Sequence, residues 1–108
     1  MKGVYGLTVL RPEDIKLLLG LSDNMLDCAG IRLTLKTIYV PKTIGELRMN
    51  DKVLPRYEEI KCDPICRLSS GAYIVRYNEY VEIPNGYMGL VFPRSSLLRM
   101  GATIYTAV

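Results

Sequence analysis

The segment 93–101, with the sequence PRSSLLRMG, holds the residue types in this chain that are best suited to binding an anion. Arg94 carries a planar guanidinium that can donate two parallel hydrogen bonds to phosphate oxygens. Ser95 and Ser96 add hydroxyls at the start of a short helical turn, where unpaired backbone N–H groups also attract anions. We expect Ser95 or Ser96 to cap this turn and Gly101 to end it in the left-handed conformation. The pattern indicates a triphosphate site, and the open alternative is a capped turn beside a solvated arginine.

Side chains that could act as metal ligands or nucleophiles are few in this sequence. Histidine is absent, which excludes His general bases, Ser-His and Cys-His pairs and zinc sites that use imidazole. Cys28, Cys62 and Cys66 could hold zinc only with a fourth ligand from elsewhere in the protein. We expect buried free thiols and keep a disulfide and a metal site as alternatives. The odd number of cysteines favours a reducing cytoplasm.

Length and charge limit the class of protein. A chain of 108 residues that is 49% hydrophobic and 23% charged predicts one folded domain over residues 1–108 and excludes whole-chain disorder. The net charge of +3 suits a small anionic ligand but is too small to indicate nucleic-acid binding. The apolar stretch 3–10 is too short to span a membrane. We expect a cytoplasmic protein without a nucleic-acid or membrane partner.

The remaining sequence predicts a mostly antiparallel β fold with one short N-terminal helix. Pro12 suits the first turn of a helix over residues 12–19, and Gly20 suits its end. The apolar face of this helix is expected to pack on a sheet edge. Alternating apolar residues predict strands over residues 31–40, 57–62, 72–77, 79–83, 87–92 and 103–108. The mixed charges of residues 46–52 predict a solvated loop.

Three segments together resemble one family. Residues 89–101 are similar to the phosphate-binding motif of the dCTP deaminase and trimeric dUTPase superfamily. Residues 29–33, AGIRL, resemble its first motif, Ala-Gly-x-Asp-Leu, which opens a strand. The helix that contains Asp14-Ile15-Lys16 resembles the N-terminal helix of the deaminase branch and of archaeal dUTPases. The resemblance covers most of the chain and implies a β-clip, a distorted jelly-roll barrel.

The resemblance also implies a site and an assembly. It implies a homotrimer with sites shared between subunits, a dUTP- or dCTP-type ligand, and Mg²⁺ bound mainly through the phosphates. By position, the triphosphate-binding residues would be Arg94, Ser95, Ser96 and Arg99. Gly30 and Gly101 would shape the turns of the site. The alternative for Arg99 is an exposed helix charge.

Two departures from the family pattern bear on activity. Arg32 stands where the first motif has aspartate; it could contact phosphate, but it cannot hold Mg²⁺, and we identify no metal ligand. The motif that supplies the catalytic carboxylate would follow Val108, so we identify no catalytic residue. We expect a domain that is incomplete at its C-terminus and inactive alone. The resemblance implies the ancestry of a dUTP diphosphatase, which converts dUTP to dUMP and pyrophosphate. The alternatives are a dCTP deaminase relative and a non-catalytic nucleotide-binding or structural β-clip protein.

Overall fold

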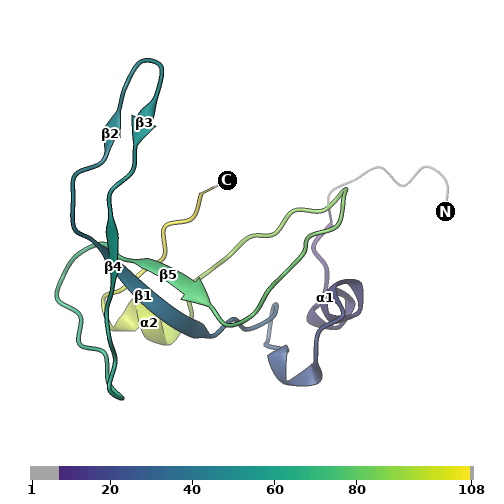
Figure 1. The fold of residues 1–108 in the computed structure, drawn as a ribbon. Helices are drawn as coiled ribbons and strands as arrows, with labels where there is room; N and C mark the ends of the chain where they lie inside the picture. Colours follow the sequence, from purple (N-terminus) through teal and green to yellow (C-terminus); the bar gives the residue numbers. More distant parts are fainter. Residues whose placement is uncertain (1–7, 108) are drawn as a thin grey trace.

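The computed structural model of the chain describes residues 8–107. Two helices, one 3-10 turn and five strands make up its regular structure (Figure 1). In chain order these are α1 (Pro12–Leu19), η1 (Asp23–Met25), β1 (Leu35–Pro41), β2 (Glu46–Leu47), β3 (Lys52–Val53), β4 (Tyr57–Glu59), β5 (Ile74–Tyr77) and α2 (Ser95–Arg99). Small antiparallel sheets and a short N-terminal helix confirm the expected mostly β class.

The long strand β1 lies at the centre of the larger sheet. It pairs antiparallel with β4 on one edge and with β5 on the other, so that Tyr39 lies opposite both Glu59 and Ile74. The strands β2 and β3 form a separate two-stranded hairpin that projects away from this sheet (Figure 1). Within residues 8–107 the strands therefore form two small sheets and close no barrel.

The two faces of β1 differ in character. Ile38 retains 4% of its surface exposed and is the one fully buried hydrophobic side chain among the described residues. It lies opposite Val75, and directly opposed residues of an antiparallel pair project to the same face. On the other face, the guanidinium of Arg76 lies 5.8 Å from the centre of the Tyr39 ring. The buried side chain of Ile38 and the Arg76–Tyr39 contact thus lie on opposite faces of the sheet.

Hydrogen bonds connect Thr34 and Leu35, at the start of β1, to the two residues that follow β5, Asn78 and Glu79. A carboxylate oxygen of Glu79 accepts the Thr34 backbone N–H at 2.8 Å, and the other accepts the Thr34 hydroxyl at 2.6 Å. The Asn78 side-chain amide donates to the carbonyl of Leu35 at 3.1 Å. Hydrogen bonds from the Thr34 hydroxyl and N–H lower the pKa of Glu79 below its ordinary value. These bonds fix where β1 begins.

The helix α1 forms over the expected residues. Pro12 lies in its first turn, and Gly20 ends it with a φ of 66° while donating its N–H to the carbonyl of Lys16. The expected packing on a sheet edge is wrong, because Leu17 and Leu18 border a small pocket with Tyr87, which belongs to no strand. No helix within residues 8–107 is long and apolar enough to cross a lipid bilayer.

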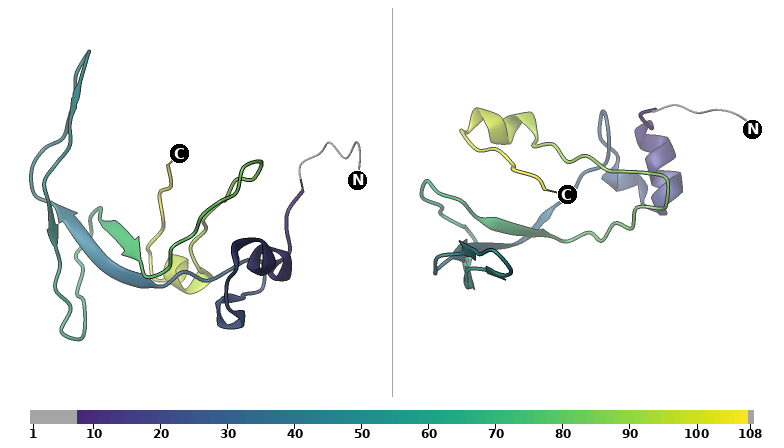
Figure 2. Two further views of the ribbon diagram at one scale, coloured as in Figure 1. Left: turned by 45° about the vertical axis from the view of Figure 1, so that its right-hand side comes forward. Right: turned by 90° about the horizontal axis from the view of Figure 1, so that it is seen from above.

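Three of the expected strands do not form. Residues 79–83 and 87–92 run side by side around a turn in which the Tyr87 N–H donates to the carbonyl of Pro84 at 3.2 Å (Figures 1 and 2). They build no ladder, because their apolar side chains are exposed and no buried face fixes a register. Residues 103–107 also form no strand, and Val108 lies outside the described residues.

Other element boundaries also differ from expectation. The strand β1 begins at Leu35, and Ile31 makes only an isolated bridge with Leu26. The expected strand over 57–62 ends at Glu59.

The expected loop over 46–52 is the β2–β3 hairpin. Arg48 pairs with Glu46 at 2.8 Å and with Asp51 at 3.5 Å across its tip, so the mixed charges stabilise a turn.

The expectation of buried free thiols is wrong. Cys62 and Cys66 form a disulfide, with their Cα atoms 4.4 Å apart, and Cys28 is free and exposed. The three-residue loop between Cys62 and Cys66 brings their Cα atoms within the range of a disulfide. No group of three or more potential metal-ligating Cys, Asp or Glu side chains exists within residues 8–107.

The chain exposes an unusual amount of surface. Its accessible area is 10134 Å², whereas a compact monomer of this mass exposes about 6,000 Å². The radius of gyration is 17.6 Å, against about 13 Å for a compact domain of this length. Large apolar side chains such as Leu47, Phe92 and Tyr105 are among those most exposed. Much of the apolar surface therefore lacks a covering partner within residues 8–107.

We predict that Glu79→Gln weakens folding and flattens its acid dependence. Because the folded-state pKa of Glu79 is lowered from 4.5, its contribution to stability is present above pH 4.5 and is lost as the pH falls through the folded-state value. Wild type and Glu79→Gln should differ in melting temperature at pH 7, and the difference should disappear as the pH falls through the lowered folded-state pKa of Glu79. Glu82→Gln, which changes an exposed carboxylate on the next segment, is the matched control. Parallel pH profiles for wild type and Glu79→Gln would contradict the prediction.

Candidate functional site

The segment expected to bind phosphate lies close to the turn that leads into the segment 29–33. Nη2 of Arg94, at the start of α2, lies 4.0 Å from Oδ2 of Asp27, which precedes the segment 29–33. Within residues 8–107 this is the one ion pair that joins segments far apart in the sequence. The side chain of Asp27 is 34% exposed and that of Arg94 is 67% exposed, so a ligand can reach both.

A tight turn before β1 presents Asp27. Its N–H donates to the carbonyl of Gly30 at 2.9 Å, and the N–H of Arg32 donates to the carbonyl of Met25 at 2.7 Å. The Arg32 guanidinium donates to the carbonyl of Asn24 at 2.7 Å and so is held against the same turn. The residue that replaces the expected aspartate therefore lies in the loop that approaches Arg94.

The start of α2 differs from the expected cap. Arg94 occupies the N-cap position, and its carbonyl accepts the N–H groups of Leu97 and Leu98 at 3.0 and 3.2 Å. No side chain caps the helix, so the expected capping by Ser95 or Ser96 is wrong. The helix begins one residue earlier than that cap requires, which places both serines in its first turn. Their side chains are exposed and can reach a ligand beside Arg94.

The end of α2 follows the expectation. Gly101 has a φ of 84° in the left-handed region, and its N–H donates to the carbonyl of Leu98 at 2.9 Å. Nothing within residues 8–107 demands glycine at Gly30, where an added Cβ would meet no atom within 4 Å. Gly101 thus shapes the turn after α2, and the role of Gly30 stays a prediction.

Arg99 lies on the exposed side of α2. Its Nε donates to the carbonyl of Ser95 at 3.4 Å, which turns the guanidinium back toward the first turn of the helix. This direction brings the Arg99 charge toward the two serines. Contact between Arg99 and a ligand stays a prediction, with the exposed helix charge as its alternative.

Asp27 is the residue of this site that the sequence reasoning did not identify. The Cys28 N–H bonds its carboxylate at 2.8 Å and lowers the pKa of Asp27, and the charges of Arg94 and Arg32 lower it further. The site therefore joins two guanidinium groups and one ionised carboxylate. The available signal was an acidic residue two positions before the segment 29–33.

Magnesium does not fit these residues as a protein-bound ion. Mg²⁺ prefers several oxygen ligands in octahedral geometry, and Asp27, which is paired with Arg94, is the one carboxylate that contacts the arginine. No cluster of three acidic or cysteine ligands exists in the described part of the chain.

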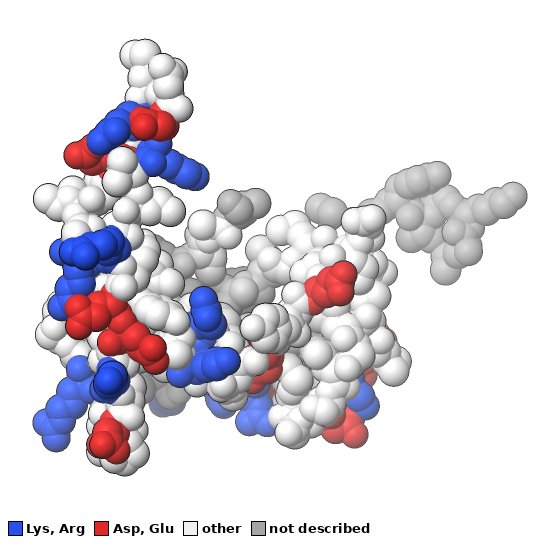
Figure 3. All heavy atoms as spheres, viewed as in Figure 1, with Lys and Arg blue, Asp and Glu red and all other residues white. Residues whose placement is uncertain are grey.

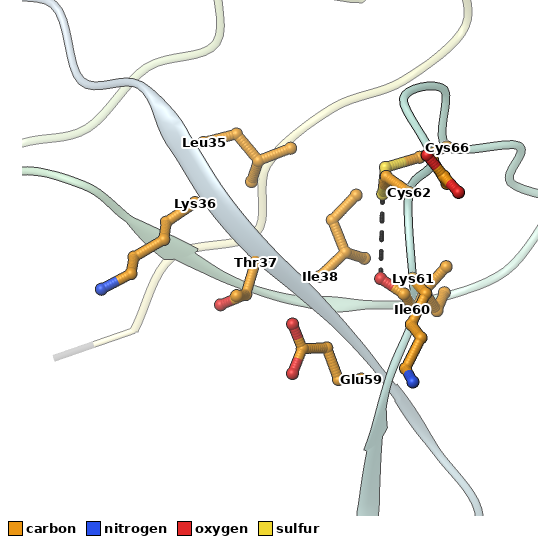
Figure 4. A pocket seen from close by; sticks show the side chains of 10 residues that line it. Leu35, Lys36, Thr37, Ile38, Glu59, Ile60, Lys61, Cys62 and Cys66 are labelled. Atoms are coloured by element: carbon orange, nitrogen blue, oxygen red, sulfur yellow. Dashed lines mark hydrogen bonds between the residues drawn. A yellow bond between two sulfur atoms is a disulfide. The ribbon is translucent and has the colours of Figure 1, made fainter.

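A separate pocket of about 500 Å³ lies against the central sheet (Figure 4). The side chains of Ile38 and Glu59 and the Cys62–Cys66 disulfide border it. The Thr37 hydroxyl beside it is buried and has no hydrogen-bond partner in the described residues. None of the residues expected to bind phosphate lines this pocket.

Charge is mixed on the face drawn in Figure 3, where basic and acidic side chains alternate over the hairpin and the sheet. The ion pairs of Arg48 with Glu46 and Asp51 account for the mixture at the hairpin tip. Arg94 is likewise paired with an acidic residue, Asp27.

Comparison with known proteins places this chain beside nucleotide enzymes. A family described as dCTP deaminase-like matches residues 13–108. The probable deoxyuridine 5'-triphosphate nucleotidohydrolase of Aeropyrum pernix is 42% identical over 90 residues, which cover 82% of this chain and 57% of that protein. The deoxyuridine 5'-triphosphate nucleotidohydrolase of Methanocaldococcus jannaschii is 38% identical over 93 residues, which cover 82% of this chain and 60% of that protein.

The match covers only part of these relatives. The chain aligns with 57% and 60% of the lengths of the two proteins just named. The probable deoxyuridine 5'-triphosphate nucleotidohydrolase of Methanosarcina acetivorans, 31% identical, is matched over 94% of this chain and 68% of its own length. No solved structure matches the chain.

We predict that Gly101→Ala destabilises the protein by about 1–2 kcal/mol, because an alanine pays the steric cost of the left-handed conformation. Gly30→Ala is the matched control, since its backbone is not left-handed and its surroundings are open. Denaturant unfolding should show the loss for Gly101→Ala and a change within about 0.5 kcal/mol for Gly30→Ala. Equal losses for both variants would refute this account of the turn.

Proposed function

Because the chain belongs to the dCTP deaminase-like family, we propose that residues 1–108 form one domain that carries the triphosphate-binding part of a dUTP diphosphatase. Such an enzyme converts dUTP to dUMP and pyrophosphate. The observation that carries the proposal is the meeting of Arg94 with the Asp27–Arg32 turn. The names of the relatives, deoxyuridine 5'-triphosphate nucleotidohydrolases, support dUTP as the ligand.

The chemistry of the proposed site is charge and hydrogen bonding. The guanidinium of Arg94 would bind two phosphate oxygens, which is the geometry that this planar fork favours. The exposed hydroxyls of Ser95 and Ser96 would donate to neighbouring oxygens. Arg32 and Arg99 would add positive charge from either side. Donors fixed before the ligand arrives stabilise a charged triphosphate without reorganisation.

Two other functions follow from particular observations. The description of the family as dCTP deaminase-like favours a cytosine nucleotide as the second candidate ligand. A non-catalytic nucleotide-binding protein is the third candidate, favoured by Arg32 in place of the expected aspartate. We propose that these 108 residues alone bind without turnover, because no carboxylate among them lies in a matching catalytic motif.

Cofactor and location are part of the proposal. Any Mg²⁺ would be held by the oxygens of the triphosphate, because the described residues build no metal site. We keep the cytoplasm as the proposed location. The Cys62–Cys66 disulfide is unusual in that reducing compartment, although hyperthermophiles provide exceptions.

We also propose a homotrimer. The support is the excess of exposed apolar surface, including Leu47 on β2, Phe92 before α2 and Tyr105 after it. Exposed apolar surface of this amount favours association, because association removes it from water. The site between the 27–32 turn and α2 is open, which leaves room for residues from a neighbouring subunit.

Arg94→Ala tests the phosphate site. We expect the variant to lose ~1.5–3 kcal/mol of dUTP binding free energy, the range of a charged hydrogen bond. Calorimetric titration with dUTP and then dCTP, with and without Mg²⁺, measures the change and ranks the two nucleotides. Product analysis of the cell contents shows whether turnover accompanies binding.

Arg67→Ala is the matched control for this experiment, because Arg67 is also exposed but lies in the connection between β4 and β5. If Arg94→Ala binds dUTP as tightly as wild type does, Arg94 is a solvated surface charge and does not bind phosphate. Steady product formation by the wild-type chain would show that its own residues supply the general base.

Sedimentation tests the proposed assembly. We expect the chain to sediment as a trimer at micromolar concentration, because association removes apolar side chains from water. Leu47→Lys, which places a charge on an apolar side chain that is 91% exposed, tests whether the hairpin takes part in the interface. A clean monomer of the wild-type chain would count against the homotrimer.

A further inference from the structure

The ion pair between Asp27 and Arg94 has a feature that phosphate binding alone does not require. A site for a triphosphate is normally lined by donors and positive charges, whereas this one contains an ionised carboxylate. Oδ2 of that carboxylate lies 4.0 Å from the arginine expected to bind phosphate. A carboxylate in this place repels the ligand that the rest of the site attracts.

The carboxylate of Asp27 is held in position by its own turn. The Cys28 N–H donates to it at 2.8 Å, and the backbone bond from Asp27 to Gly30 fixes the turn. The Leu26–Ile31 bridge closes the same turn. Asp27 therefore presents a fixed anion, and Arg94, whose side chain is 67% exposed, is the partner with freedom to move.

We propose that Asp27 is an internal counter-ion that holds the guanidinium of Arg94 in the ligand-free protein and is displaced from it by phosphate. This inference rests on the proposed function, because it assigns a second role within the same triphosphate site. Asp27 is a positioning residue: it acts through Arg94 and makes no contact with the ligand.

The Arg94–Asp27 ion pair is weaker than a contact between Arg94 and phosphate, which favours the displacement of Asp27 by the ligand. An ion pair between exposed side chains contributes little to stability and is further weakened by salt. A guanidinium bound by two phosphate oxygens forms shorter and stronger charge-assisted hydrogen bonds. Arg94 can therefore leave Asp27 at small cost. Arg32, bound to the carbonyl of Asn24, stays beside Asp27 and keeps its charge compensated after the exchange.

Asp27→Asn tests the inference, because asparagine keeps the oxygen that accepts the Cys28 N–H but removes the charge. We expect dUTP to bind this variant about two- to five-fold more tightly than wild type, the factor that matches the strength of an exposed ion pair. The gain should shrink as salt is raised. Titrations are run on the whole chain with Mg²⁺-free dUTP and repeated with pyrophosphate as the probe.

Asp51→Asn is the matched control, because it removes the same charge at the hairpin tip, where Asp51 pairs with Arg48 at 3.5 Å. It should leave the affinity for dUTP within experimental error of wild type. Affinity that is unchanged or weaker in Asp27→Asn, or equally increased in Asp51→Asn, would overturn the inference.

A second measurement needs no ligand and separates this inference from the proposed function. Carbon NMR of the Asp27 carboxyl follows its titration in the free protein, where the pKa of Asp27 is lowered in part by Arg94. Arg94→Ala should raise that pKa, and Arg67→Ala should leave it unchanged. If dUTP does not bind wild type, the proposed function fails while this titration still tests the pair. A pKa of Asp27 that Arg94→Ala does not move would show that the counter-ion is absent.

Discussion

Pairing of the central strand β1 with β4 and β5 is the constraint from which the rest of the arrangement follows. The ladders on both edges of β1 surround Ile38, the one fully buried hydrophobic side chain of the described residues. At the start of the strand, Glu79 holds Thr34 through its carboxylate. Because the turn with Asp27 and Arg32 directly precedes this anchored point, the ladder determines where that turn lies. The turn that approaches Arg94 thus lies just before the start of a strand, where backbone hydrogen bonds limit movement.

The same constraint explains why the chain leaves so much apolar surface uncovered. A three-stranded sheet has two faces, and a short chain with two short helices has little material to cover either. The extensive contacts between elements are those among the strands, so neither helix covers an apolar sheet face. The segment 78–92 turns back on itself without a ladder, and α2 lies to one side of the sheet (Figure 2). Association of subunits would cover this surface, and it would also bring new side chains to the open site beside Arg94.

Features that depend on neighbouring residues were predicted correctly more often than features that depend on contacts between distant parts of the chain. Pro12 and Gly20 predicted the bounds of α1 correctly, because both act through the backbone of their immediate neighbours. Gly101 was identifiable for the same reason, since only glycine adopts a φ of 84° without steric cost. The strands expected around Pro84 failed because alternation creates a strand only where one face is buried. The contact of Asp27 with Arg94 was beyond sequence reasoning, because it depends on how β1 and the segment 78–92 bring two distant parts of the chain together.

Replacement of the expected aspartate by Arg32 changes the electrostatics of the site as a whole. With aspartate at this position, Arg94 would face two carboxylates, and a triphosphate would need a divalent cation to approach without repulsion. With Arg32, the cluster of Arg32, Arg94 and Asp27 has two positive charges and one negative charge. In the ligand-free protein the Asp27 carboxylate lies 4.0 Å from Arg94 and offsets part of the positive charge of the cluster. Arg32, Arg94 and Asp27 together leave the cluster with one net positive charge, which would favour a phosphate group over a bare metal ion.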